Sequence, residues 1–159
     1  IAQTTRCTEP PIISGMKSMD DLERHVRILH TNFAQKSIGV FFKFNGGKEG
    51  RDKFAEKFAD DDWAQVYVDF KSRVDLCAPG VFIANTQVAK GLEFDIVILA
   101  DLQNWPSEPT ARDDGQFYVL LSRSRDILQI AYVGEDEPPL LKNPRYKDRF
   151  GNITHKRPR

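Results

Sequence analysis

The sequence predicts an α/β domain in which a mainly parallel sheet lies between layers of helices. Three short runs, at residues 38–42, 81–84 and 96–100, contain no polar side chain, which is typical of strands buried on both faces. Apolar residues with helical spacing precede the first run and follow the last. Strands of this kind that alternate with helices favour a parallel sheet covered by helices on both sides.

The first strand and helix are predicted between residues 10 and 33. Two prolines and two isoleucines at positions 10–13 indicate a short strand that follows a turn. Ser18 precedes two aspartates at positions 20–21, which predicts a helix N-cap because the helix dipole favours acidic residues in the first turn. Apolar residues at three- and four-residue steps from Leu22 to Phe33 give this helix one apolar face.

The middle of the chain is less regular. After the buried run 38–42, the glycine pair at 46–47 interrupts the chain and the phenylalanines at 54 and 58 indicate a second short helix. Alternation over residues 66–70 weakly favours a strand. The acidic triplet at 60–62 indicates a solvated loop or helix cap rather than a metal site, because consecutive side chains point in different directions.

The last third of the chain is predicted to hold one helix and one further strand. The loop at 103–112 contains Trp105, which either packs inside the domain or belongs to a partner surface. One of the aspartates at 113–114 is expected to cap a helix that continues to Arg125. The apolar residues at 127–133 predict the closing strand.

Composition excludes several classes of protein. The 159 residues are 40% hydrophobic and 29% charged, which is typical of a globular chain and not of a disordered one. No apolar run is long enough for a membrane helix, and the two cysteines, 70 residues apart, predict reduced thiols in a cytoplasmic protein. Since residue 1 is isoleucine, we expect a processed product or an excised piece of a longer chain.

The charge is uneven along the chain. Residues 142–159 hold seven Lys and Arg against one Asp, whereas the chain as a whole is neutral. We therefore predict a body at residues 1–141 and a basic C-terminal tail at 142–159. The tail is either solvated and partly disordered, or it contacts nucleic acid through Lys156, Arg157 and Arg159.

Two segments, 85–95 and 117–125, place charged residues next to buried strands. We expect these charges at the carboxyl ends of the strands, the edge where open parallel sheets bind ligands. The glycine beside a lysine at 90–91 allows close backbone approach to a phosphate. The arginines at 123 and 125 have a simpler alternative explanation, since basic residues favour the C-terminus of a helix.

These segments also resemble known motifs. The string AKGLEFDIVIL at residues 89–99 resembles motif V of the superfamily 1 helicases of the UvrD/Rep type, and FYVLLSRSR at 117–125 resembles their motif VI, usually written YVALTRAR. The resemblance extends over about residues 9–134, although only the two motifs are specific. It implies a RecA-like three-layer α/β sandwich with a mainly parallel central sheet, the second (C-terminal) motor domain of such a helicase.

The resemblance also implies roles for single residues. Arg123 matches the motif VI arginine that reaches the γ-phosphate of ATP, an arginine finger that stabilises charge on the transferred phosphoryl group. Glu93 matches the motif V glutamate that contacts the nucleotide, and Lys90 and Gly91 lie where the backbone turns beside the nucleotide. Arg125 matches a frequent second arginine, which either adds to the nucleotide site or only pairs with an acid.

The implied nucleic-acid contacts come from the start of the first segment. Gln87 stands where many members of the family carry a histidine near single-stranded DNA, and glutamine can also form hydrogen bonds; Thr86 precedes it. Asn85 and Ser122 replace threonines of the family pattern.

The sequence lacks the phosphate-binding loop G-x-x-x-x-G-K-[ST], because the glycines at 46–47 precede Lys48 without that spacing. The resemblance therefore implies a first RecA-like domain in the same parent chain. That domain would bind the ATP phosphates and would be the main part of the protein that holds the Mg²⁺. Around residues 59–80 the helical subdomain that the family often inserts is expected to be reduced or absent. We expect the isolated chain to be inactive as an ATPase.

Two other functions remain open from the sequence. The chain could be a catalytically degenerate RecA-like domain that acts as a protein-interaction or DNA-binding module. An unrelated nucleotide enzyme on the same sheet has no supporting nucleophile or base in the sequence.

Overall fold

The computed structural model describes residues 11–44, 46–66, 78–89, 92–149 and 153–158. Seven strands form one sheet in the order β3-β4-β2-β5-β6-β1-β7, and every pair of neighbouring strands is parallel. Their bounds are β1 Ile12–Met16, β2 Ser37–Phe42, β3 Ala64–Val66, β4 Gly80–Asn85, β5 Phe94–Leu99, β6 Ser124–Val133 and β7 Thr154–Lys156. The predicted sheet of buried parallel strands is confirmed.

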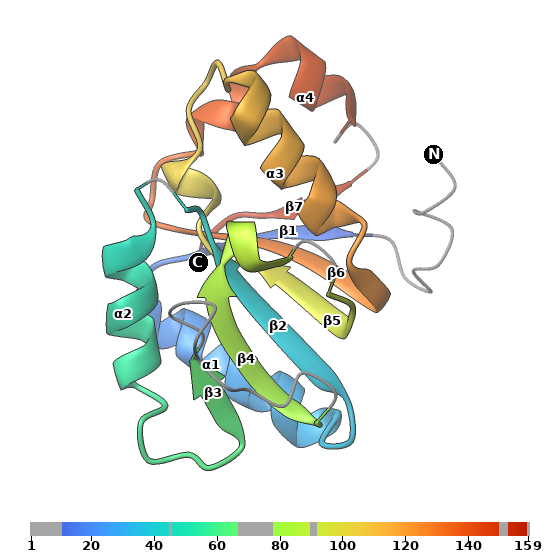
Figure 1. Ribbon diagram of the computed structural model, residues 1–159. Helices are drawn as coiled ribbons and strands as arrows, with labels where there is room; N and C mark the ends of the chain where they lie inside the picture. Colours follow the sequence, from blue (N-terminus) through green and yellow to red (C-terminus); the bar gives the residue numbers. More distant parts are fainter. Residues whose placement is uncertain (1–10, 45, 67–77, 90–91, 150–152, 159) are drawn as a thin grey trace.

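Helices cover both faces of the sheet (Figure 1). They are α1 Met19–Asn32, α2 Lys48–Glu56, α3 Ala111–Leu121 and α4 Pro144–Arg149, with short 3-10 turns η2 Thr86–Ala89, η3 Leu102–Asn104 and η4 Pro139–Lys142. One apolar core contains Leu22 of α1 and Phe54 of α2, and a second contains Phe117 of α3 and Tyr146 of α4. Two cores separated by one sheet make a three-layer α/β sandwich, as predicted.

The helix starts follow local capping chemistry. The Ser18 side chain accepts a hydrogen bond from the Asp21 amide, so the predicted N-cap of α1 is confirmed. For α3 the prediction of an aspartate cap is wrong. Thr110 caps this helix, because its hydroxyl accepts from the Asp113 amide while the Asp113 carboxylate accepts from the Thr110 amide, both at 3.1 Å. Asp113 thus forms the other half of a capping box.

The end of α3 also differs from the prediction. The helix ends at Leu121, so Arg123 and Arg125 are not part of it. Arg125 instead lies in β6, whose pairing with β5 begins at Phe94 opposite Ser124. The ladder of backbone hydrogen bonds to a neighbouring strand outweighs local helix propensity at this point.

Part of the predicted tail at 142–159 packs against the rest of the fold. Tyr146 is fully buried, with its ring 5.3 Å from that of Phe117, and β7 adds a parallel strand beside β1. The described part of this segment is therefore packed against the rest of the fold, because its apolar side chains complete the second core. Trp105 is only 1% exposed, so it packs inside the domain.

Several predicted features lie outside the described residues. These include both cysteines and most of the weak strand expected at 66–70, of which the structure describes only the end of β3. Among the described residues, every helix is too short or too polar to span a lipid bilayer.

Candidate functional site

The predicted site residues lie at two opposite edges of the sheet. Glu93 immediately precedes β5, and Arg123 immediately precedes β6. Thr86 and Gln87 follow β4. Because all strands are parallel, the first pair lies at the amino edge and the second at the carboxyl edge, about 20 Å apart for six-residue strands. The prediction that all these residues gather at the carboxyl edge is wrong, because the chain crosses the sheet between residues 85 and 94.

The amino edge brings the two motif segments together. The Phe94 amide donates a hydrogen bond to the Arg123 carbonyl at 3.0 Å, so the residue after Glu93 contacts the backbone of Arg123. Glu93 is exposed and Arg123 is half-buried. Lys90 and Gly91 lie outside the described residues. Two segments about 30 residues apart in sequence thus form one short stretch of surface.

The Arg123 side chain has an unused donor. Its Nε is buried and has no hydrogen-bond partner among the described residues. A buried donor without a partner destabilises the folded state by about 1–3 kcal/mol. The Arg123 side chain as a whole is only half-buried, so an anion could still reach the other nitrogens of the guanidinium.

Asp95 of β5 contacts residues of both neighbouring strands, β2 and β6, at the same edge. Its carboxylate accepts hydrogen bonds from the Ser37 amide at 3.0 Å and the Ser37 hydroxyl at 3.3 Å, at the start of β2. It also forms a 3.2 Å ion pair with Arg125. Arg125 therefore has an acidic partner, as one of its two sequence interpretations expects. Nearby, the hydrogen bond that the Lys36 ammonium donates to the Asp126 carboxylate raises the pKa of Lys36.

The carboxyl edge contains a buried polar network. The Thr86 hydroxyl donates to Gln116 of α3 at 2.9 Å and accepts from the Phe44 amide at 3.2 Å. Asn85, 2% exposed, accepts a hydrogen bond from Arg51 of α2. Gln87, in contrast, is exposed. The predicted nucleic-acid residues thus differ: Thr86 links the segment after β2 to the middle of α3, whereas the Gln87 side chain faces solvent.

Three charged residues in this network were not predicted as site residues from the sequence. Asp101 is fully buried and accepts hydrogen bonds from the Lys43 amide at 2.9 Å and from Asn104 at 2.9 Å. The Lys43 ammonium forms a 3.2 Å ion pair with Asp113. Lys43 follows β2, Asp101 lies shortly after β5 and Asp113 lies in the first turn of α3. Their spacing in the sequence does not predict that Lys43 contacts both aspartates.

The pKa values of the two aspartates shift in opposite directions. Burial raises the pKa of Asp101 from 3.8 to about 7, although the hydrogen bonds from Asn104 and Lys43 act against it. Burial also acts to raise the pKa of Asp113, but the hydrogen bonds from Thr110 and Lys43 outweigh it and the net pKa is lowered. Asp101 therefore changes charge near neutral pH.

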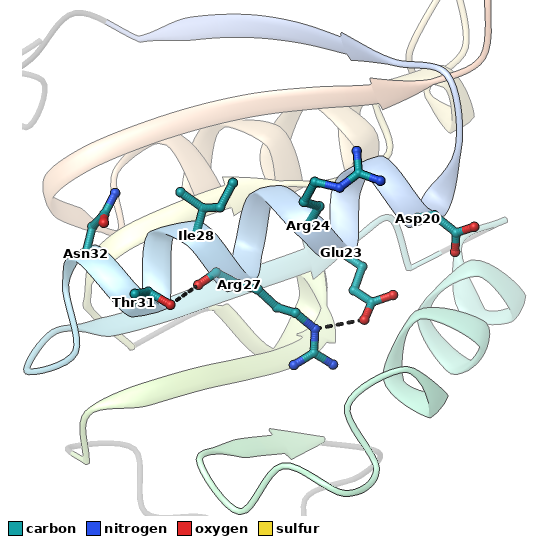
Figure 2. Close-up of a pocket in the computed structure, with 7 residues that line it drawn as sticks. All are labelled: Asp20, Glu23, Arg24, Arg27, Ile28, Thr31 and Asn32. Carbon is teal, nitrogen blue, oxygen red and sulfur yellow. Dashed lines mark hydrogen bonds and ion pairs between the residues drawn. The ribbon is translucent and has the colours of Figure 1, made fainter.

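A surface hollow lies along α1, on one face of the sheet. It has a volume of about 600 Å³ and is lined along α1 by Asp20, Glu23, Arg24, Arg27, Ile28, Thr31 and Asn32. Figure 2 shows that all seven residues come from one helix, where Arg27 bonds to Glu23 at 2.8 Å. Since no residue of the two motif segments lines it, this hollow is separate from the predicted site residues. The described residues also contain no group of three or more possible metal ligands.

Known proteins share this fold at low sequence identity. No family model and no curated protein matches the sequence. The C-terminal domain of a possible DNA helicase from Lactobacillus plantarum WCFS1 superposes with a TM-score of 0.61 and 19% identity over 96% of this chain and 94% of that domain.

Two larger helicases contain a similar domain. The Pyrococcus furiosus Hef helicase domain gives a TM-score of 0.53 with 19% identity over 82% of this chain, and the Arterivirus nonstructural protein 10 helicase gives 0.51 with 12% identity over 98%. The chain spans only 27% and 36% of their lengths. Its fold is that of the RecA-like α/β domains of helicases.

Proposed function

We propose that this chain is the C-terminal motor domain of an ATP-dependent helicase or translocase of the UvrD/Rep type. The observation that carries the proposal is the junction of the two motif segments at the amino edge, where the Phe94 amide bonds to the Arg123 carbonyl. In this function Glu93 contacts the nucleotide and Arg123 is the arginine finger. Arg123 is only half-buried and its Nε has no partner among the described residues, which supports a guanidinium that is still free to bind an anion.

In this function ATP lies at the amino edge of the sheet and nucleic acid at the carboxyl edge. ATP with Mg²⁺, held mainly by a first RecA-like domain of the parent chain, would supply the phosphoryl group for hydrolysis. At the amino edge, Arg123 offers a planar cation to the charge that develops on that group. At the opposite edge, the exposed Gln87 would contact a single strand of DNA, and the buried Thr86 would position the turn that carries it. Closure of the two domains on ATP would then move the strand.

The decisive experiment is DNA-stimulated ATP hydrolysis by the parent protein that carries both domains. Arg123→Ala is expected to lower the rate by about 10³-fold or more, the scale of a lost arginine finger, with ATP binding largely retained. Arg24→Ala is the matched control, because this arginine is 70% exposed on α1 and pairs locally with Asp21. The isolated 159-residue chain is expected to hydrolyse no ATP.

Other outcomes have clear meanings. If Arg123→Ala hydrolyses ATP like the wild type, Arg123 is not the finger and the motor proposal loses its main residue. If the wild-type parent protein hydrolyses no ATP with DNA present, the alternative of a catalytically degenerate module for protein or DNA binding replaces it.

A further inference from the structure

A phenylalanine at the carboxyl edge holds two cations. Phe44 follows β2 and is half-buried. The Lys48 Nζ lies 5.0 Å from the centroid of its ring, and the Arg112 Cζ lies 5.5 Å from it. Both distances are within the range of cation–π contacts. Lys48 opens α2 and Arg112 lies in the first turn of α3, so segments from two helices meet on one ring.

Within the part of the chain that the structure describes, the two cations lack carboxylate partners. Among the described residues, neither Lys48 nor Arg112 forms an ion pair, and both side chains are exposed. Lys53, one turn further along α2, shows the usual arrangement, since it pairs with Glu49 at 2.9 Å. An aromatic ring holds a cation in place without neutralising it. The ring thus positions two positive charges that remain available to an anion.

This cluster is joined to the predicted nucleic-acid residues. The Phe44 amide donates to the Thr86 hydroxyl, and that hydroxyl donates to Gln116 on the same helix as Arg112. The ring, the two cations and the turn that carries Gln87 therefore belong to one connected part of the surface. An aromatic ring between basic side chains is the composition with which proteins bind single strands.

We propose that Phe44, Lys48 and Arg112 form a platform for single-stranded nucleic acid, in which the Phe44 ring stacks on a base and the two cations contact the adjacent phosphates. A base that reaches the ring displaces a cation, which exchanges a weak exposed cation–π contact for a charge-assisted hydrogen bond to phosphate. The class of ligand, single-stranded nucleic acid, rests on the proposed function. The stacking is independent of sequence, because every base has a π-face.

The test is fluorescence anisotropy of labelled oligonucleotides with the 159-residue chain at low salt. Three strands of equal length are compared: oligo-dT, oligo-U, and an abasic deoxyribose-phosphate strand. Phe44→Ala is expected to weaken binding of the two base-bearing strands by about tenfold, the effect of losing one stacked base, and to leave the abasic strand nearly unchanged. Phe44→Tyr is expected to bind like the wild type, since it keeps the ring.

The exposed cations give a second readout that does not depend on the ring. Lys48→Ala and Arg112→Ala are each expected to weaken binding of all three strands and to reduce the slope of log affinity against log salt by about 0.7. Lys53→Ala is the matched control, because it removes the same charge from the same helix. It is expected to leave both the affinity and the slope at their wild-type values.

Three results would overturn the platform. They are wild-type affinity of Phe44→Ala for the base-bearing strands, equal weakening by Lys53→Ala and Lys48→Ala, and no binding of any strand by the wild type. The comparison of oligo-dT with oligo-U identifies the preferred nucleic acid, and a preference for either supports the platform. The ATPase test of Arg123 is separate, so the platform can fail while the motor function stands, and the reverse.

Discussion

Replacing Asp101 by asparagine is expected to remove a dependence of stability on pH. The Asp101 side chain is fully buried at the end of β5, and its carboxylate contacts the Lys43 amide and the Asn104 side chain. Asparagine has nearly the same shape but carries no charge. The variant therefore separates the effect of the buried charge from the effect of packing.

The magnitude follows from the change in pKa. Burial raises the pKa of Asp101 from 3.8 to about 7, which makes ionisation about 4 kcal/mol less favourable in the folded state than in the unfolded chain. Below pH 3.8 both states are protonated and nothing is lost. Between pH 3.8 and 7 the unfolded state releases a proton that the folded state keeps, so stability falls as pH rises, and above pH 7 the loss is complete.

Equilibrium urea unfolding at pH 5, 6, 7 and 8 measures this loss. Between pH 5 and 8, the free energy of unfolding of the wild type is expected to fall by about 2.5 kcal/mol relative to Asp101→Asn. The difference between the two proteins is the relevant quantity, because other groups titrate in both. Burial lowers the pKa of His155, for example, so its contribution rises with pH up to about 6.5.

Asp20→Asn is the control for this experiment. Its hydrogen bond from Lys57 lowers the pKa of Asp20, so it is ionised in both states throughout pH 5–8 and contributes no slope there. If wild type and Asp101→Asn show parallel stability profiles, Asp101 titrates normally and the argument from burial is refuted. A constant offset between parallel profiles would report only on the altered hydrogen bonds.

Three further substitutions test the packing. Gly115→Ala, at an exposed position of α3 where an added methyl group would meet only open space, is expected to raise the free energy of unfolding by about 0.5–1 kcal/mol. Gly80→Ala is expected to lower it by about 1–3 kcal/mol or more, because φ is +128° and the new Cβ would lie 2.3 Å from the Trp63 carbonyl; equal effects of the two substitutions in urea unfolding would contradict this. Tyr146→Ala is expected to lower it by about 3–5 kcal/mol, since the ring is buried against Phe117, and a neutral effect would show that residues after 141 do not stabilise the fold.

The sequence by itself determined the fold class and most of its elements. Strands β2, β4 and β5 were predicted from unbroken apolar runs, and the start of α1 from Ser18 and the acidic residues after it. Such features depend on a few neighbouring residues, because burial of a strand and capping of a helix leave a local pattern in the chain. The two motif segments were also readable, since each is contiguous.

Only the tertiary structure decided where the segments lie relative to one another. Residues 85–87 and residue 93 belong to one short segment of the sequence but lie at opposite edges of the sheet. Arg125 is part of β6 because β5 provides a neighbouring strand for pairing. The Lys43–Asp101 and Lys43–Asp113 contacts and the contact of Arg112 with Phe44 join residues that are dozens of positions apart. Their meeting depends on strand order and helix placement, which arise from long-range packing and leave no periodic signal in the sequence.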